Sequence, residues 1–202
     1  LMGGLRRENL NPNPFVQFNS WLEQAVSSKI PDPTAMILAT VADDGQPDQR
    51  IVLLKHLDEK GFVFYTNYNS EKGKAIAQNP NICMSFFWPS IERQVIIKGV
   101  AEKTSELDSE NYFHSRPKGS QIGAVVSHQS EVIPNREYLE ERLKSLDAEY
   151  EGKEVPRPEH WGGFLVKPVS VEFWQGRPNR LHDRIRFTLQ DDFDWKIERL
   201  SS

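Results

Sequence analysis

The sequence predicts an α+β fold, in which an antiparallel β-barrel carries a few helices on its outer side. Three observations lead to this prediction: many short segments have β-type patterning, tight turns separate them, and few segments have helical periodicity. With 202 residues, 38% of them apolar and 27% charged, the chain is expected to form one domain over residues 1–202. Strands are expected at residues 35–42, 49–56, 62–66, 82–88, 93–103, 163–166, 169–174, 184–189 and 195–200.

Helices are expected in five segments. The first covers residues 14–29, because Pro14 suits an opening turn and large apolar side chains recur at helical spacing from Phe15 to Val26. A short helix over residues 70–78 separates two strands. The others are expected outside the sheet, at residues 106–115, at 121–126 with Ser120 as the cap, and at 135–151.

Charge and cysteine content narrow the classes of function. A net charge of −4 gives no overall attraction for nucleic acid or an anionic membrane, so an anionic ligand must be held by a local group of Arg and Lys. No apolar run approaches the roughly 18 residues of a membrane span, and no apolar stretch follows the basic residues near the N-terminus. Cys83 is the only cysteine, which favours a reducing compartment and predicts a cytoplasmic protein.

The segment Arg50-Ile51-Val52-Leu53-Leu54-Lys55 places an apolar strand between two cations. In a regular strand Arg50 and Lys55 have opposite parity and point to opposite faces. They would then serve different ligands or different sides of one site. The alternative is that both are solvated charges at the ends of a strand.

The segment Tyr112-Phe113-His114-Ser115-Arg116-Pro117-Lys118-Gly119-Ser120 joins a helix end to a helix start. Tyr112 and Arg116 are four residues apart and share a helical face, and Pro117 ends the helix there. Ser120 is expected to open the next helix, whose free backbone N–H groups favour an anion. These groups predict a cup for phosphate; the alternative is a capped junction with an exposed arginine.

Arg180, His182 and Arg184 form a third constellation. If the chain enters a strand here, the three side chains share one face. Because neighbouring cations repel one another, an opposing anion explains the pattern better than a purely structural role. The alternative, contact with nucleic acid or a solvated surface, is weakened by the acidic balance of the chain.

Other polar residues give weaker signals. Lys72 lies near the start of a short helix, where it could meet a phosphate, although exposed charges are common at such positions. Gln94, Gln129 and Ser130 carry groups that hydrogen-bond a heterocycle. The five histidines show no metal-ligand spacing, and neither a Gly-rich phosphate loop nor a Ser/His/Asp pattern occurs, so no metal site and no hydrolase is predicted.

Over nearly its whole length the chain resembles the pyridoxamine 5′-phosphate oxidase family. The resemblance is carried by Asp32-Pro33-Thr34-Ala35-Met36, Gln49-Arg50-Ile51-Val52-Leu53-Leu54-Lys55, Phe64-Tyr65-Thr66-Asn67, Glu92-Arg93-Gln94-Val95, Tyr112-Phe113-His114-Ser115-Arg116-Pro117, Trp161-Gly162-Gly163-Phe164, and Phe173-Trp174-Gln175-Gly176 with Arg180-Leu181-His182-Asp183-Arg184. It implies a split β-barrel that works as a homodimer and holds two FMN molecules between its subunits. It also implies an N-terminal arm over residues 1–12 and a dimerisation and substrate-binding part over residues 160–202.

The resemblance assigns roles position by position. FMN contacts are implied for Arg50, Ile51, Val52, Leu53, Leu54, Lys55, Tyr65, Thr66, Lys72, Gln94, Gln129, Ser130, Trp174 and Arg184. Substrate contacts are implied for Lys55, Tyr112, Arg116, Ser120, Arg180, Leu181 and His182. A secondary product site in some relatives resembles Arg6, Arg7 and Arg199. The chain departs from the family pattern at Glu71, where many relatives carry Arg and where a negative charge stands beside Lys72.

The implied activity is the oxidation of pyridoxamine 5′-phosphate and pyridoxine 5′-phosphate to pyridoxal 5′-phosphate, by hydride transfer from C4′ to the flavin and reoxidation by O₂ to hydrogen peroxide. Arg180 and His182 are then the catalytic residues, as positioning and electrostatic groups. No nucleic acid or membrane partner is expected. The rival predictions are a flavin reductase with another substrate, a non-catalytic carrier of FMN or pyridoxal phosphate, and, more distantly, a small barrel that binds nucleic acid.

Overall fold

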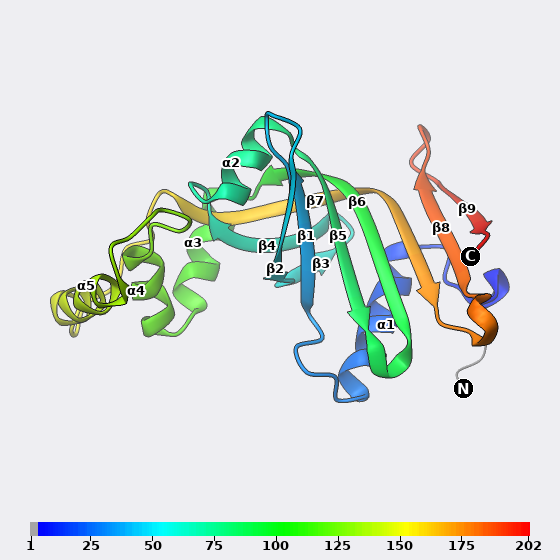
Figure 1. The fold of residues 1–202 in the computed structure, drawn as a ribbon, viewed down its shortest axis with the longest axis horizontal. Helices are drawn as coiled ribbons and strands as arrows, with labels where there is room; N and C mark the ends of the chain where they lie inside the picture. The colour runs from blue at the N-terminus through cyan, green and yellow to red at the C-terminus, as the bar shows by residue number, and fades with distance from the viewer. Residues whose placement is uncertain (1–3) are drawn as a thin grey trace.

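The computed structural model describes residues 4–202, and its centre is a nine-stranded antiparallel sheet (Figure 1). The strand order is β2-β1-β5-β6-β7-β4-β3, with β8 paired to β7 and β9 to β8. The strands are β1 (Ala35–Val41), β2 (Pro47–Leu53), β3 (His56–Asp58), β4 (Gly61–Asn67), β5 (Asn81–Trp88), β6 (Arg93–Lys103), β7 (Trp161–Gln175), β8 (Asp183–Leu189) and β9 (Trp195–Leu200). Every pairing is antiparallel, which confirms that part of the predicted fold class.

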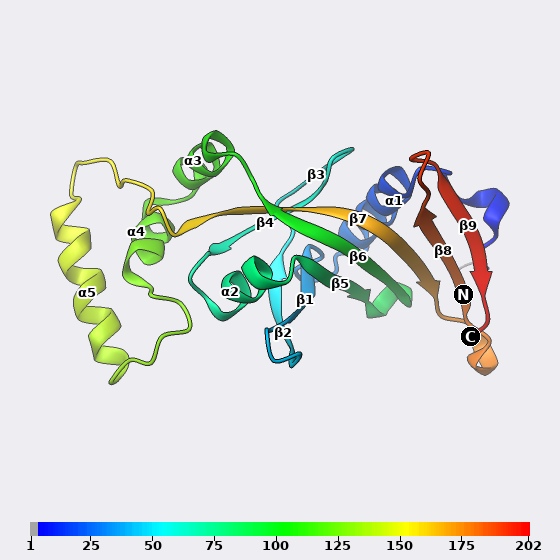
Figure 2. The ribbon, with the colours of Figure 1, turned by 90° about the horizontal axis from the view of Figure 1, so that it is seen from above.

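The longest strand, β7, connects the two ends of the molecule. It pairs with β6 along most of its length, with β4 through residues 161–166, and with β8 through residues 170–175. Figure 2 shows β7 running from the helices α3–α5 at one end to β8 and β9 at the other. The sequence predicted two strands here, at residues 163–166 and 169–174. The register shift at Lys98 and Gly99 lies opposite Pro168 and lets one strand continue through it.

Five α-helices accompany the sheet: α1 (Pro14–Ser27), α2 (Glu71–Gln78), α3 (Glu106–Ser115), α4 (Lys118–Val126) and α5 (Arg136–Glu149). Pro14 occupies the first turn of α1, as the sequence predicted, and the Asn13 side chain caps the helix. No helix in the described part of the chain combines the length and apolar character needed to cross a membrane.

The buried apolar residues form two separate clusters. The larger lies under α1, where Phe18 packs its ring against Phe62 and Phe86 with centroids 5.1 and 4.9 Å away. The smaller joins α3 and α4 to the segment that enters β7, and it consists of Phe113, Ile122, Val126, Val155 and Trp161. The second cluster fixes α3 and α4 above the end of the sheet.

Candidate active site

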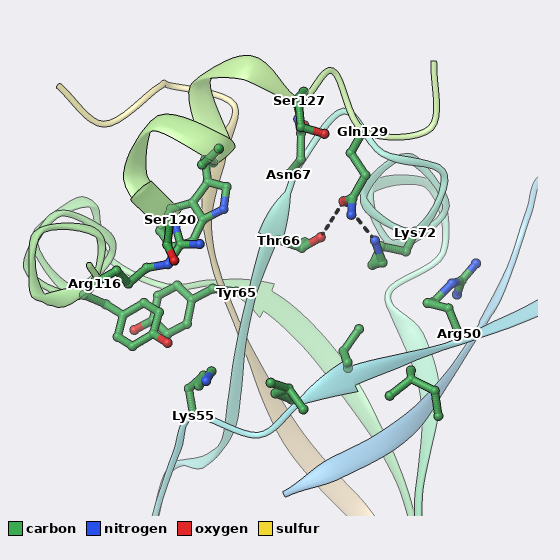
Figure 3. Close-up of a pocket in the computed structure, with 17 residues that line it drawn as sticks. Arg50, Lys55, Tyr65, Thr66, Asn67, Lys72, Arg116, Ser120, Ser127 and Gln129 are labelled. Atoms are coloured by element: carbon green, nitrogen blue, oxygen red, sulfur yellow. Dashed lines mark hydrogen bonds between the residues drawn. The ribbon is translucent and has the colours of Figure 1, made fainter. Parts of the chain in front are cut away.

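A cavity of about 610 Å³ opens where β2, β4, α2, α3 and α4 meet (Figure 3). Among the described residues that line it, four are cations and none is a carboxylate. It brings together twelve of the residues predicted to bind ligands: Arg50, Ile51, Val52, Leu53, Lys55, Tyr65, Thr66, Lys72, Tyr112, Arg116, Ser120 and Gln129. A concave site with several cations is suited to an anionic ligand of small-molecule size.

One end of the cavity, the Lys72 end, consists of Arg50, Thr66, Lys72 and Gln129. Ser70 caps α2 by accepting from the Gly73 N–H, and this turn places Lys72 at the cavity wall with 8% of its surface exposed. The Lys72 Nζ donates to the Gln129 Oε1 at 3.0 Å, and the Thr66 hydroxyl donates to the same oxygen at 3.2 Å.

Lys72 is a buried cation that has no carboxylate partner among residues 4–202. Burial lowers its pKa and the nearby charge of Arg50 lowers it further, while the Asp48 carboxylate partly opposes this shift. The positive charge of Arg50 is balanced by Asp48, because the Arg50 Nη2 lies 2.6 Å from an Asp48 carboxylate oxygen. Glu71 is exposed, and its backbone N–H donates to the Ser130 hydroxyl, so its charge does not neutralise Lys72. A ligand anion at this end would therefore supply the missing negative charge.

The other end, the Arg116 end, consists of Lys55, Tyr112, Arg116 and Ser120. The Tyr112 ring stacks on Tyr65 with centroids 3.9 Å apart. Burial and the nearby Asp108 and Tyr112 raise the pKa of Tyr65 to about 12, so its hydroxyl stays protonated at neutral pH. The Arg116 guanidinium lies 4.6 Å from the Trp161 ring centroid, and its Nη1 is buried without a hydrogen-bond partner in the described structure.

Ser120 reaches this end differently from the prediction. Helix α4 begins at Lys118, with Pro117 before it, so Ser120 lies within the first turn and does not cap the helix. Its backbone N–H already donates to the Pro117 carbonyl, which leaves the hydroxyl as the group available to a ligand. The prediction of a free Ser120 N–H was wrong, because Pro117 has an extended backbone that suits the residue just before a helix.

Arg50 and Lys55 line the same cavity, although strand parity predicted opposite faces. Strand β2 ends at Leu53, so the alternation does not extend to Lys55. Leu54, which was predicted to contact a cofactor, lies in the main core with 6% exposure and does not line the cavity. Ser130 lines a neighbouring cavity of about 380 Å³ on the loop before α5.

A second group of predicted residues lies at the far end of the sheet. This group, the β8 cluster, lines a hollow of about 270 Å³ and contains Gln94, Trp174, His182 and Arg184. Gln94 and Arg184 flank Trp174 on the two strands beside β7. The Arg184 guanidinium pairs with Glu172 at 3.0 Å, and the His182 ring lies 4.7 Å from the Trp174 ring.

Arg180 and Leu181 lie beside the β8 cluster in an exposed turn. The sequence predicted that Arg180, His182 and Arg184 would alternate along a strand, and this was wrong. Residues 178–180 form a short 3-10 turn in which Asn179 and Arg180 have φ values of 60° and 61°, and β8 begins only at Asp183. The His182 Nδ1 accepts from the Arg177 backbone N–H at 3.1 Å, so a neutral His182 carries its proton on Nε2.

Five residues at the main cavity were not predicted as site residues: Asn67, Gly123, Ala124, Ser127 and Trp161. Asn67 donates to the Ser127 carbonyl at 3.2 Å and so ties β4 to the loop that carries Gln129. Asn67 and Trp161 do belong to stretches that carried the family resemblance, which is the signal that could have identified them. Ser127 gave no signal in the sequence.

Comparisons with known proteins agree with this geometry. Residues 22–148 match the family model described as pyridoxamine 5′-phosphate oxidase, and residues 161–202 match the one described as pyridoxine 5′-phosphate oxidase C-terminal dimerisation region. The pyridoxine/pyridoxamine 5′-phosphate oxidase of Flavobacterium johnsoniae is 62% identical over 98% of this chain and 93% of its own. The protein of the same name from Nostoc sp. PCC 7120 is 54% identical over 98% and 92%.

Solved structures show the same fold. PhzG from Burkholderia lata 383, in complex with tetrahydrophenazine-1-carboxylic acid, superposes with a TM-score of 0.92 at 28% identity over 98% of each chain. A pyridoxamine 5′-phosphate oxidase-related FMN-binding protein from Nostoc punctiforme gives a TM-score of 0.75 at 15% identity, over 96% of this chain and 100% of its own. The curled antiparallel sheet is thus a split barrel, and the chain belongs to the pyridoxamine 5′-phosphate oxidase family.

Proposed function

We propose that this chain is an FMN-dependent, cytoplasmic oxidase that makes pyridoxal 5′-phosphate. Pyridoxine 5′-phosphate and O₂ give pyridoxal 5′-phosphate and H₂O₂; pyridoxamine 5′-phosphate, O₂ and water give the same two products and ammonia. Family membership supports this reaction. The observation that carries it is the main cavity, whose two ends each hold cations without a lining carboxylate, as two phosphorylated ligands require.

The Lys72 end suits the phosphate of FMN. Lys72 is the buried cation without an anion, and Thr66 and Gln129 supply hydrogen-bonding groups beside it. Ile51, Val52 and Leu53 give the adjoining wall an apolar surface, as a flat aromatic ring requires. When bound there, FMN supplies the chemistry, because it accepts a hydride from the substrate and is reoxidised by O₂.

The Arg116 end suits the phosphate of the substrate. Lys55 and Arg116 supply positive charge, and Tyr112 and Ser120 supply hydroxyl groups. Each charge-assisted hydrogen bond contributes about 1.5–3 kcal/mol, so three or four can hold a small phosphorylated molecule. These side chains bind and orient the substrate; none is required to move a proton.

The β8 cluster cannot reach the main cavity of its own chain. Trp161 and Trp174 stand at opposite ends of β7, thirteen residues apart (174 − 161 = 13), which corresponds to about 40 Å of strand at 3.3 Å per residue. We infer that each active site combines the main cavity of one subunit with the β8 cluster and Arg180 of its partner. The match to a dimerisation region supports this homodimer.

An apolar patch on the outer face of the sheet also supports the homodimer. Ile37 on β1 lies opposite Ile51 on β2, and both are exposed, at 37% and 65%. Leu53 and Phe87 add exposed apolar surface from β2 and β5. Since Ile51 and Leu53 also line the main cavity, a partner that covers this patch would border the ligand site.

Within such a site, Arg180 and His182 would hold the substrate ring. The His182 Nδ1 is occupied as an acceptor, so its Nε2–H is the group that faces a ligand. Arg180 is exposed in its turn, and its positive charge would stabilise negative charge on the ring. Trp174, Gln94 and Arg184 would contact the flavin from the partner's side.

The direct test is an oxygen-electrode assay on the purified protein. We expect a yellow protein that consumes O₂ with pyridoxamine 5′-phosphate and with pyridoxine 5′-phosphate, releases H₂O₂, and produces the absorbance of pyridoxal 5′-phosphate. Removing FMN should abolish turnover and adding it back should restore turnover. A colourless protein that cannot be reconstituted excludes the proposal, and a flavoprotein that binds these phosphates without O₂ uptake is a carrier.

Subunit complementation tests the composite site. Arg116→Ala damages the main cavity and Arg180→Ala damages the neighbourhood of the β8 cluster, so each homodimer should have low activity. After the two variants exchange subunits, about a quarter of wild-type activity is expected, because about half of the dimers are mixed and one of their two sites is intact. If mixing restores no activity although exchange is verified by mass spectrometry, both residues serve one subunit's site.

A further inference from the structure

Trp161 opens β7 at the Arg116 end of the main cavity, and 7% of its surface is exposed. Its ring is nearly parallel to those of Tyr65 and Tyr112, at interplanar angles of 12° and 7° and centroid distances of 5.5 and 6.2 Å. The three rings form an aromatic wall beside the substrate-phosphate residues. Nothing in the proposed function uses Trp161.

The Arg116 side chain contacts this wall. Its guanidinium carbon lies 4.6 Å from the Trp161 centroid, within the range of a cation–π interaction. Arg116 makes no ion pair with a carboxylate among residues 4–202, and burial lowers its pKa. The aromatic face attracts the cation but accepts none of its N–H groups, and the Nη1 is left without a partner.

This arrangement differs from the usual way of holding a buried arginine. A carboxylate would occupy the donors of the guanidinium, whereas a ring face fixes its position and leaves the donors free. An arginine that is ordered only on binding loses side-chain entropy in the process. A guanidinium already held against Trp161 avoids part of this cost when phosphate arrives.

Building on the proposed function, we propose that Trp161 is a positioning residue that makes the enzyme select phosphorylated substrates. Trp161 holds the Arg116 guanidinium at the cavity wall, with its free donors available to a tetrahedral oxyanion. Trp161 therefore affects recognition of the substrate phosphate and does not affect the reaction at the C4′ carbon.

The two glycines after Trp161 make the wall possible. A Cβ on Gly163 would come within 2.9 Å of the Tyr65 ring and 2.7 Å of the Thr104 hydroxyl, and a Cβ on Gly162 would come within 2.2 Å of the Tyr68 hydroxyl. Any side chain at these positions would displace the tyrosines of β4 and its following turn. The Trp161-Gly162-Gly163 stretch therefore acts as one structural unit that holds Tyr65 and Arg116 in place.

The test compares Trp161→Leu with Trp161→Phe in the FMN-loaded enzyme. For pyridoxamine 5′-phosphate, we expect Trp161→Leu to raise KM about 10-fold with little change in kcat, since the aromatic contact holds the half-buried cation in place for binding and takes no part in the reaction step. For unphosphorylated pyridoxamine, kcat/KM should stay the same. Trp161→Phe keeps an aromatic face and should lie between wild type and Trp161→Leu. Equal losses on both substrates would overturn the proposal.

A double-mutant cycle and a binding measurement complete the test. In an Arg116→Met background, Trp161→Leu should have no further effect on the KM for the phosphorylated substrate; additive effects would overturn the proposal. Trp195→Leu removes a tryptophan from β9 and should leave the preference for phosphate unchanged.

Titration with inorganic phosphate should show about 10-fold weaker binding for Trp161→Leu and an unchanged FMN affinity. The titration does not need turnover, so a wild-type enzyme that binds phosphate but fails to oxidise B6 phosphates contradicts the proposed function alone.

Discussion

Replacing Arg180 by alanine is expected to lower kcat/KM for pyridoxamine 5′-phosphate by about 100- to 1,000-fold while FMN stays bound. Arg180 makes no ion pair within residues 4–202, so its charge is available to a ligand. Asn179 and Arg180 both adopt left-handed backbone conformations, each of which costs about 1–3 kcal/mol for a residue other than glycine.

Steady-state kinetics and flavin absorbance check this prediction together. Arg186→Ala is the matched control, because Arg186 lies on β8 and pairs with Glu198 at 3.2 Å, a surface pair worth at most about 1 kcal/mol. The control should keep its turnover and its flavin. Unchanged turnover in Arg180→Ala would remove Arg180 from the mechanism, and loss of flavin would place it at the cofactor instead.

Replacing Lys72 by methionine is expected to weaken FMN binding by about 10- to 100-fold, because one charge-assisted hydrogen bond to phosphate contributes about 1.5–3 kcal/mol. The apoprotein should melt at the same or a higher temperature than wild type. Its buried charge is gone, and the Gln129 Oε1 still accepts from Thr66. Opposite effects on cofactor affinity and on apoprotein stability identify a residue that is kept for its ligand.

The stability of the apoprotein is also expected to depend on pH through Lys72. Since burial holds the pKa of Lys72 below its ordinary 10.5, the unfolded chain binds the proton more tightly than the folded apoprotein does. Wild-type apoprotein therefore gains stability from this group as the pH rises through the lowered pKa towards 10.5. The stability advantage of Lys72→Met should shrink over the same range.

Fluorescence titration with FMN and thermal melts of the apoprotein measure the two effects. Lys74→Met is the control, because Lys74 is exposed on the same helix. It should change neither quantity appreciably. A Lys72→Met apoprotein that is less stable and binds FMN with wild-type affinity would show that Lys72 is a structural residue.

The sequence predicted local structure well where periodicity and turn chemistry agree. Helix α1 follows from Pro14 and the spacing of Phe18 and Trp21, and the strands β1, β2, β4, β5 and β6 follow from their apolar runs and the turns between them. It failed where a long-range contact decides the outcome. Two strands were predicted over residues 163–174, but the register shift opposite Pro168 on β6 keeps β7 intact.

The sequence predicted most of the residues that line the candidate site, but only part of their arrangement in space. Tyr112 and Arg116 come together because helical spacing fixes their relation. Arg180 and His182 were assigned strand alternation, which the left-handed turn at Asn179 prevents. Trp161 was missed, because its contact with Arg116 joins residues 45 positions apart (161 − 116 = 45) and leaves no local pattern.

Because the buried apolar residues form two separate clusters, the parts of the molecule that rest on them are expected to open at different temperatures. The helices that carry Tyr112, Arg116 and Ser120 rest on the smaller cluster, and α5 next to them buries no residue at all. Segments with so few buried contacts exchange their amide hydrogens by local opening, well below the free energy of complete unfolding. We therefore expect α3 and α4, which carry the residues proposed to bind the substrate phosphate, to exchange their amide hydrogens faster than the central sheet.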